Sequence, residues 1–376
     1  QSAVAEAGKA PVLRTVARPR NAVQWALYYP PVIYTGPGAA GLPANDPRLY
    51  SQRASQLLAV GRVDEAGAEI GRALSLDPKA SDALALQTII LIVQNQKDKA
   101  LETAERAVSA DANSATARIA LSYAQQARFD LEGARTSLEE AVKLDSANAL
   151  AWARLAEMHM SFGFLDRALA AARRAAALDP NLSRTQTVLG FAHLAQVDTR
   201  QAREAFDRAI ALDPADPLPR LGMGLAIIRE GQLREGGEQI EIAASLDPNS
   251  SLIRSYLGKT YFEEKRTGLD EAEYAIAKEL DPNDPTPYFY NAIAKQTTNR
   301  PVEALRDYQK AIELNDNRAV YRSRLLLDSD EAARQAALAR VYSDLGFQQL
   351  ALVEGWKSLN TDPTSSSAHR FLADSY

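Results

Sequence analysis

The sequence predicts an all-α protein, a solenoid of helix-turn-helix repeats, because three regularities recur along its 376 residues. A marker position, most often proline, returns every 34 residues. Alanine stands five residues before each marker, and a small residue stands twelve before it in seven of eight cases. Small residues fixed at two heights of a helix indicate close helix contact on two sides. The markers are Pro78, Ala112, Ser146, Pro180, Pro214, Pro248, Pro282 and Asp316.

Residues 149–182 show what each position of the repeat contributes. Gly163 opens the turn between a first helix, helix A, and a second, helix B. Ala168 lets the two helices lie close together, and Ala175 faces the next repeat. Pro180 ends helix B, because proline lacks an amide donor and disfavours helix in the residue before it.

This period and its residue types resemble the tetratricopeptide repeat, from residue 47 to the end of the chain. The resemblance implies a right-handed superhelix whose helices A line the concave side. It also implies protein binding, although a scaffold fold does not name its partner. In residues 149–182 the pattern is carried by Trp152, Leu155, Ala156, Gly163, Ala168, Ala175 and Pro180.

In chain order, the sequence divides into four parts. Residues 1–46 hold 6 of the 18 prolines and read as an extended, strand-like segment rich in aromatic residues. Eight repeats fill 47–318, beginning with Asp46 as N-cap and Pro47 at the first helical position. An insert at 319–331 then breaks the period, either as a longer helix or loop packed on its neighbour or as a docking element. Residues 332–376 hold a ninth repeat and half of a tenth.

The N-terminal segment carries too much apolar area to remain in water, so we expect it to dock on protein. Its apolar residues resemble the linker of bacterial envelope proteins that place a FecR-like domain before a tetratricopeptide array. This resemblance implies the bacterial envelope, the periplasm or the extracellular surface. The residues concerned are Trp25, Leu27, Tyr28, Tyr29, Ile33 and Tyr34.

Composition argues against several function classes. A net charge of -5 disfavours nucleic acid as the main partner. The chain has no cysteine, no apolar run long enough to span a bilayer, and no motif for a nucleophile, phosphate or cofactor. His159 and His193 lie one repeat apart, but no further ligands accompany them. We therefore expect interior histidines, no metal, no cofactor and no enzyme.

The helix A positions that usually select a peptide are apolar here, which leaves two interpretations open. Tight winding could pack these side chains repeat on repeat, or a groove could bind an extended apolar segment. The proposed groove residues are Ile89, Ile92, Tyr123, Met160, Phe191, Leu194, Leu225, Ile228, Phe262 and Phe289.

A chain with these features is expected to be a protein-binding scaffold that associates with other copies end to end. Its N-terminal segment would bind the groove, in the same molecule or in the next, and the half repeat would expose Phe371 and Leu372. The alternative is a monomeric adaptor whose groove takes a peptide or polymer from another source. The chain itself is expected to be a processed protein or a piece of a longer one.

Overall fold

The computed structural model describes residues 42–59, 62–94, 96–128, 130–314, 327–361, 363 and 365–375. These residues form two compact units. The N-terminal unit holds residues up to 160 together with 164–196, and the C-terminal unit holds 161–163 and 197 onwards. The six apolar residues between Trp25 and Tyr34 lie outside the described residues, as does most of the insert.

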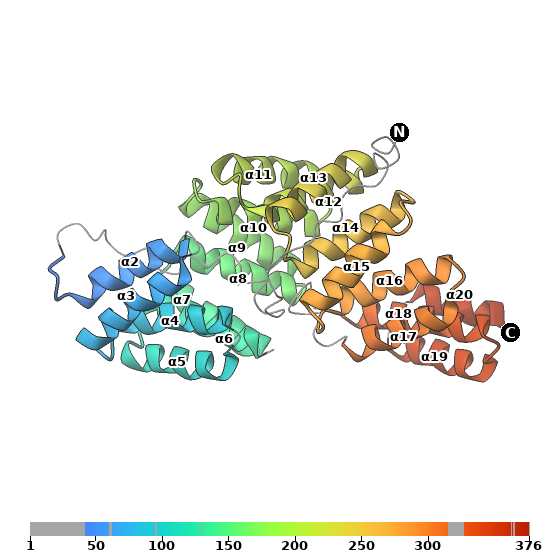
Figure 1. Ribbon diagram of the computed structural model, residues 1–376, viewed down its shortest axis with the longest axis horizontal. Coiled ribbons are helices and arrows are strands. Elements are labelled where there is room, and N and C mark those ends of the chain that lie inside the picture. The colour runs from blue at the N-terminus through green and yellow to red at the C-terminus, as the bar shows by residue number, and fades with distance from the viewer. Residues whose placement is uncertain are drawn as a thin grey trace, which may run out of the picture. The chain divides into compact units, whose positions relative to one another are not determined.

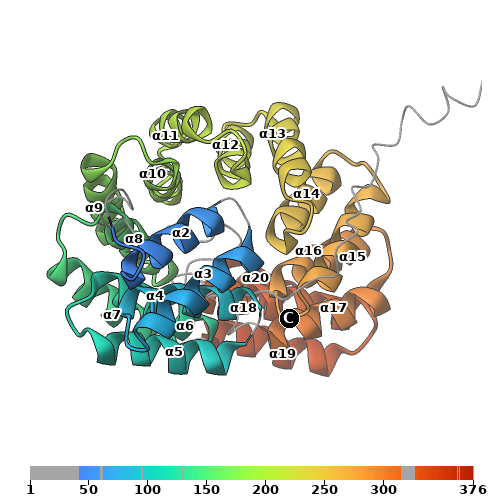
Figure 2. The same ribbon diagram turned by 60° about the vertical axis from the view of Figure 1, so that its left-hand side comes forward.

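Within each unit, consecutive helices run antiparallel, as Figures 1 and 2 show. The helices of the N-terminal unit are α2 (Pro47–Ala59), α3 (Val63–Leu76), α4 (Ser81–Val93), α5 (Lys97–Ala110), α6 (Ala115–Ala127), α7 (Leu131–Leu144), α8 (Ala149–Ser161), α9 (Leu165–Leu178) and α10 (Ser183–Ala195).

The C-terminal unit continues the same frame. Its helices are α11 (Thr199–Leu212), α12 (Pro217–Arg229), α13 (Leu233–Leu246), α14 (Ser251–Glu263), α15 (Leu269–Leu280), α16 (Pro285–Thr297), α17 (Pro301–Glu313), α18 (Leu327–Asp344), α19 (Gln348–Thr361) and α20 (Ser366–Ser375). The described residues contain helices and no strand, so the predicted all-α helical-repeat solenoid class is confirmed.

Three helices begin at an aspartate followed by proline, as the sequence predicts. The carboxylate of Asp46 accepts the Arg48 amide at 2.9 Å, and Asp216 and Asp284 accept the amides two residues on at 2.9 and 2.8 Å. Each bond satisfies one of the free amides at the start of its helix.

Aspartate also ends helix B at seven repeat edges of the described chain. At each edge its amide donates to an alanine carbonyl four residues earlier, and its carboxylate accepts the amide two residues later. The same turn forms where alanine or serine replaces the marker proline, so aspartate rather than proline builds it. The expectation that proline ends helix B is therefore wrong for these repeat edges. The seven residues are Asp77, Asp111, Asp145, Asp179, Asp213, Asp247 and Asp281.

Alanine fills the contacts between helices at both predicted heights. The residue five before each marker is fully buried in all eight repeats, and the alanines twelve before it are fully buried as well. At one contact even alanine is too large. A β-carbon on Gly236 of α13 would lie 2.6 Å from the carbonyl oxygen of Gly224 in α12. Glycine therefore lets these two helices approach more closely than alanine would.

The turn from helix A to helix B uses left-handed backbone in each of its last six described copies. Glycine occupies this position at Gly163, Gly231 and Gly346, where it adopts positive φ without strain. Val197 has φ 67° in the same place, which a β-branched residue adopts only with strain. Lys265 and Asn299 complete the series, with φ 57° and 59°.

Helix α18 is longer than the other helices A. It spans 18 residues where the helices A of earlier repeats span 13, and it begins at Leu327 inside the segment treated as an insert. The last residues of that segment therefore extend a helix. The inserted residues up to 326 lie outside the described part of the chain.

Candidate functional site

Three of the predicted groove residues are buried inside the N-terminal unit and cannot meet a partner. Ile89 and Ile92 of α4 lie in its central apolar cluster. Tyr123 of α6 lies under Arg154 of α8, whose guanidinium carbon sits 3.9 Å from the ring centroid. Burial raises the pKa of the Tyr123 hydroxyl. For these three positions the groove assignment is wrong, because helix A packs directly on the next helix A.

The other seven predicted groove residues are half-buried. Leu225 and Ile228 pack on a cluster around Leu221 and Ile240, and Phe289 packs between Tyr290 and Tyr308. Each keeps part of its apolar surface in solvent. A role in a groove stays a prediction for Met160, Phe191, Leu194, Leu225, Ile228, Phe262 and Phe289.

The C-terminal half repeat does not expose the apolar face expected of it. Phe371 and Leu372 of α20 are buried against Ala339 and Ala351. The expectation for these two side chains is wrong, because α18 and α19 already cover them.

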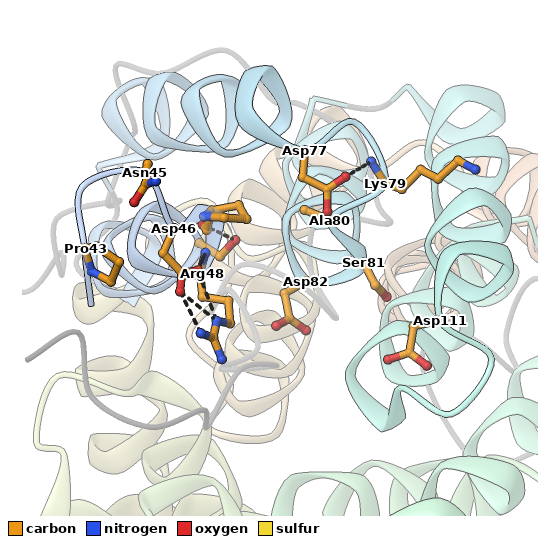
Figure 3. Close-up of a pocket in the computed structure, with 12 residues that line it drawn as sticks. Pro43, Asn45, Asp46, Arg48, Asp77, Lys79, Ala80, Ser81, Asp82 and Asp111 are labelled. Atoms are coloured by element: carbon orange, nitrogen blue, oxygen red, sulfur yellow. Dashed lines mark hydrogen bonds and ion pairs between the residues drawn. The ribbon is translucent and has the colours of Figure 1, made fainter. Parts of the chain in front are cut away.

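A concave pocket of about 610 Å³ opens where α2 and α4 begin, within the N-terminal unit. Figure 3 shows Asp82 between Arg48 and Asp111. Arg48 is held by Asp46 through an ion pair of 2.6 Å, and the Ser81 hydroxyl donates to the Ala107 carbonyl. Sequence reasoning missed this pocket. The available signal was that Arg48 and Asp82 occupy the second position of helix A in successive repeats.

Charge in this pocket is predominantly negative. Asp46, Asp77, Asp82 and Asp111 line it together with only two cations, Arg48 and Lys79. Burial and the neighbouring Asp111 raise the pKa of Asp82, against the opposing charge of Arg48. An ammonium or guanidinium group of a bound chain would relieve this repulsion.

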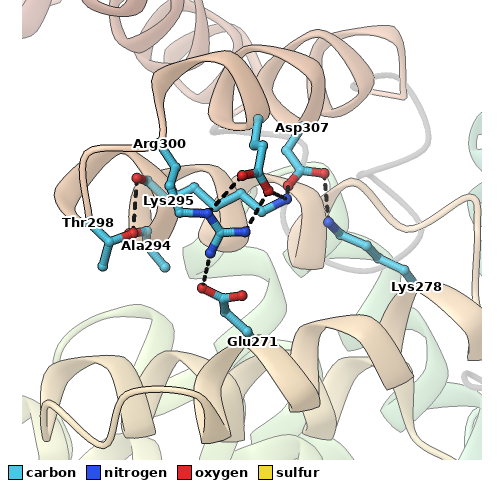
Figure 4. A network of polar contacts seen from close by, with 8 residues as sticks. Glu271, Lys278, Ala294, Lys295, Thr298, Arg300 and Asp307 are labelled. Atoms are coloured by element: carbon cyan, nitrogen blue, oxygen red, sulfur yellow. Dashed lines mark hydrogen bonds and ion pairs between the residues drawn. The ribbon is translucent and has the colours of Figure 1, made fainter.

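A second polar cluster joins α15, α16 and α17 (Figure 4). Asp307 accepts Lys278 at 2.6 Å and Lys295 at 2.8 Å. Beside them, Arg300 bridges Glu271 and Glu303 at 2.5 Å each. Three cations thus face three carboxylates, and burial lowers the pKa of Lys278. The balanced charges fasten neighbouring repeats together.

His159 and His193 are interior, as expected. His159 and His193 are buried, and burial is the main cause that lowers the pKa of His159. Among the described residues, no group of three or more potential ligands is placed to hold a metal ion. No helix in the described chain is both long and apolar enough to cross a membrane.

Part of the repeat array resembles a known family. Residues 52–115 and 117–183 match the family model described as tetratricopeptide repeat. No curated protein sequence matches the chain. Among solved structures, TTC0263, a tetratricopeptide repeat protein of Thermus thermophilus, is 23% identical over 48% of this chain and 98% of its own, with a TM-score of 0.45.

Two further solved structures are similar to parts of this chain. A tetratricopeptide repeat protein of Parabacteroides merdae is 14% identical over 65% of this chain and 99% of its own, with a TM-score of 0.49. YrrB, described as a tetratricopeptide repeat protein with an unusual peptide-binding site, is 18% identical over 49% of this chain and 94% of its own, with a TM-score of 0.33.

Proposed function

Because residues 52–115 and 117–183 are tetratricopeptide repeats and the later helices keep their frame, we propose that this protein is a non-enzymatic scaffold for protein binding. We further propose that it works in the bacterial envelope or the extracellular space. There it would associate with other copies end to end, through the segment from Trp25 to Tyr34.

One observation carries the binding function, namely the row of half-buried apolar side chains on helices A of both units. Side chains such as Phe191 and Phe289 are held in place by packing on one side and meet solvent on the other. A partner that covers them gains apolar burial without first ordering them. The charge cluster of α15, α16 and α17, in contrast, consists of closed ion pairs that fasten helices to each other.

Self-association is supported by the sequence of the N-terminal segment. Six large apolar residues fall within ten positions, and residues 21–45 contain no charged side chain. Such a segment gains free energy by docking on a protein surface. Its resemblance to the linker of envelope proteins supports the proposed location, which fractionation of the native cells would test.

Sedimentation velocity of the full chain at increasing concentration tests self-association. We expect the mean sedimentation coefficient to rise with concentration, and deletion of residues 1–35 to remove the rise. A chain that stays monomeric at every concentration would refute end-to-end assembly and leave the binding scaffold standing.

The alternative is a monomeric adaptor that takes a peptide of another protein, or an envelope polymer. The pocket beside Asp82 and Asp111 favours a basic peptide as its ligand. In that case Asp82→Asn would weaken binding of a lysine-rich peptide, while Asp64→Asn on the exposed face of α3 would not. Isothermal titration calorimetry of the two variants separates the adaptor from the assembling scaffold.

A further inference from the structure

Four large apolar side chains stand exposed in succession at the start of α19 and along it. Phe347 is 54% exposed, and Leu350, Val353 and Trp356 are each 49% exposed. Residues three apart are neighbours on a helix surface, so the four form a continuous row. We call this row the α19 patch. Of the twelve exposed large apolar side chains among the described residues, these four belong to it.

The same positions carry charge in at least half of the other eight repeats. Thirteen residues are inserted before the ninth repeat, so Leu350 corresponds to Glu303 and Trp356 to Gln309. Exposed equivalents of Leu350 include Glu65, Lys99, Arg167, Glu235 and Glu303. Exposed equivalents of Val353 include Glu102, Glu204, Glu238 and Arg306. The ninth repeat has thus replaced a polar outer face by an apolar one.

A following helix of the array would not cover this patch. Helix α20 packs on a different side of α19, where a β-carbon on Gly355 would lie 2.9 Å from Cδ1 of Phe371. In the earlier repeats, the positions equivalent to the patch are exposed or half-buried, and none is buried, even though further helices follow. The patch is therefore a surface for something outside the regular stacking.

The size of the patch favours a short segment over a second patch. Two half-exposed aromatic residues and two half-exposed aliphatic residues offer roughly 300–400 Å². Two such patches face to face would bury less than the roughly 1,200 Å² of a stable interface. An extended segment of about ten residues can cover the row without needing a second patch.

Charge and sequence single out the N-terminal segment as that partner. Residues 7–45 carry Lys9, Arg14, Arg18 and Arg20 and no carboxylate, a charge of +4. Residues 327–361, which form α18 and α19, hold five carboxylates and three cations, a charge of -2. The basic stretch immediately precedes the uncharged aromatic run, and the negative charge of residues 327–361 lies on α18, so the basic stretch would lie beside α18 when the aromatic run covers the α19 patch.

We propose that the α19 patch binds the segment Trp25 to Tyr34 of a second copy of this chain. This inference rests on the proposed self-association and identifies its receptor. The exposed side chains of Leu350 and Trp356 cover the apolar residues of the arriving segment, and the exposed Asp344 lies at the end of α18, next to the start of the patch. Each chain carries one segment and one patch, so the contact is head to tail and can continue from copy to copy.

Photocrosslinking in the full chain tests this contact. Trp25 is replaced by benzoylphenylalanine in a chain grown with ¹⁵N, which is then mixed with unlabelled chain and irradiated. We expect labelled Trp25 peptides joined to the unlabelled tryptic peptide of residues 341–357. Crosslinks between copies that map elsewhere would overturn the α19 patch as receptor while leaving self-association intact.

The other outcomes are equally decisive. Crosslinks to residues 341–357 that join only labelled to labelled peptide would show that the segment binds within its own chain, against the second copy. A monomeric chain without crosslinks between copies would refute the self-association and this inference together.

A matched pair of variants isolates the patch. The double variant Leu350→Glu with Trp356→Glu restores the polar character of the other repeats at exposed sites, so the fold should persist by circular dichroism. We expect its apparent dissociation constant for assembly to rise at least about tenfold, and the crosslink to disappear. The control Val302→Glu alters an equally exposed apolar residue on α17 and should change neither. Unchanged assembly in the double variant would overturn the assignment.

Discussion

The two units stack helices in the same 34-residue frame but fill their interiors differently. In the N-terminal unit, one apolar cluster runs from Ala54 to Met158 through alanine, leucine and isoleucine. In the C-terminal unit, smaller apolar clusters alternate with buried polar groups. Arg254 of α14 is fully buried and pairs with Glu273 of α15, 2% exposed, at 2.8 Å. Asp247 and Asp284, which flank this pair in the sequence, are buried as well.

The difference shows that the 34-residue repeat is maintained by its backbone turns and small residues. It does not require one particular composition of the core. Both units keep the buried alanines and the aspartate turns. Buried charge adds little net stability while it is paired, but it makes a unit sensitive to the loss of either partner. We therefore expect the C-terminal unit to respond far more strongly to single substitutions and to pH.

The largest effect should follow Glu273→Ala. Arg254 would keep its bond to the Pro248 carbonyl and its attraction to Asp247 but lose the Glu273 carboxylate, its buried ion-pair partner. We expect a loss of about 3–5 kcal/mol in the free energy of unfolding. Hydrogen exchange should rise in α14 and α15 and stay unchanged in α4 to α7, because repeats contact only their neighbours.

The matched control in the N-terminal unit is Glu65→Gln, which removes the exposed pair with Arg62. It should leave stability and exchange unchanged. Equal effects of the two substitutions would contradict the contrast between the units.

The second effect concerns the close approach of α12 and α13. Gly236→Ala places a β-carbon 2.6 Å from the Gly224 carbonyl oxygen and should cost about 1–3 kcal/mol by urea unfolding. Gly71→Ala in α3 meets no atom within 4 Å and should instead stabilise the protein by up to about 1 kcal/mol. Replacing glycine by alanine is therefore expected to lower the free energy of unfolding at Gly236 in the C-terminal unit and to raise it at Gly71 in the N-terminal unit. A stabilising Gly236→Ala would show that these helices can separate without loss.

The smallest effect depends on pH. Burial raises the pKa of Asp247 to about 6, although the Asn249 amide and Arg254 oppose this. Because the folded pKa exceeds the ordinary value near 3.8, the stabilising contribution is complete below about pH 4 and is lost as pH rises through 6. Asp247→Asn should thus match the native chain near pH 4 and exceed its stability by about 1–2 kcal/mol at pH 7.5.

Thermal unfolding at both pH values provides the measurement, and Asp145→Asn is the control. Asp145 forms the same turn in an exposed position of the N-terminal unit. A pH-independent difference between Asp247→Asn and the native chain would contradict the role given to burial.

The sequence predicted the helices well because repetition averages out local ambiguity. Eight copies of one pattern identify Ala175 and its equivalents as interior contacts more firmly than one helix could. The sequence could not show that Val197 adopts left-handed backbone, because valine disfavours that conformation. Nor could it show that Ile89 is buried, because burial on the concave side depends on how tightly neighbouring helices A approach.

The candidate site was predicted only in part, for two physical reasons. In the sequence, an apolar residue on helix A that packs on a neighbouring helix cannot be distinguished from one that faces a ligand, as Tyr123 shows. The α19 patch was visible in principle, since Leu350 and Trp356 stand where other repeats carry charge. That signal depends on placing the ninth repeat across the insert and on the exposure of those side chains.

The aspartate turns affect how the number of repeats in such a chain can change. Each turn is closed by hydrogen bonds within a few residues, so a repeat edge requires no specific partner far along the chain. A duplication or deletion of one 34-residue block would join one such edge to another that is already compatible. The lineage of this protein could lengthen or shorten in whole repeats, except at α12 and α13, where Gly224 and Gly236 would have to travel together.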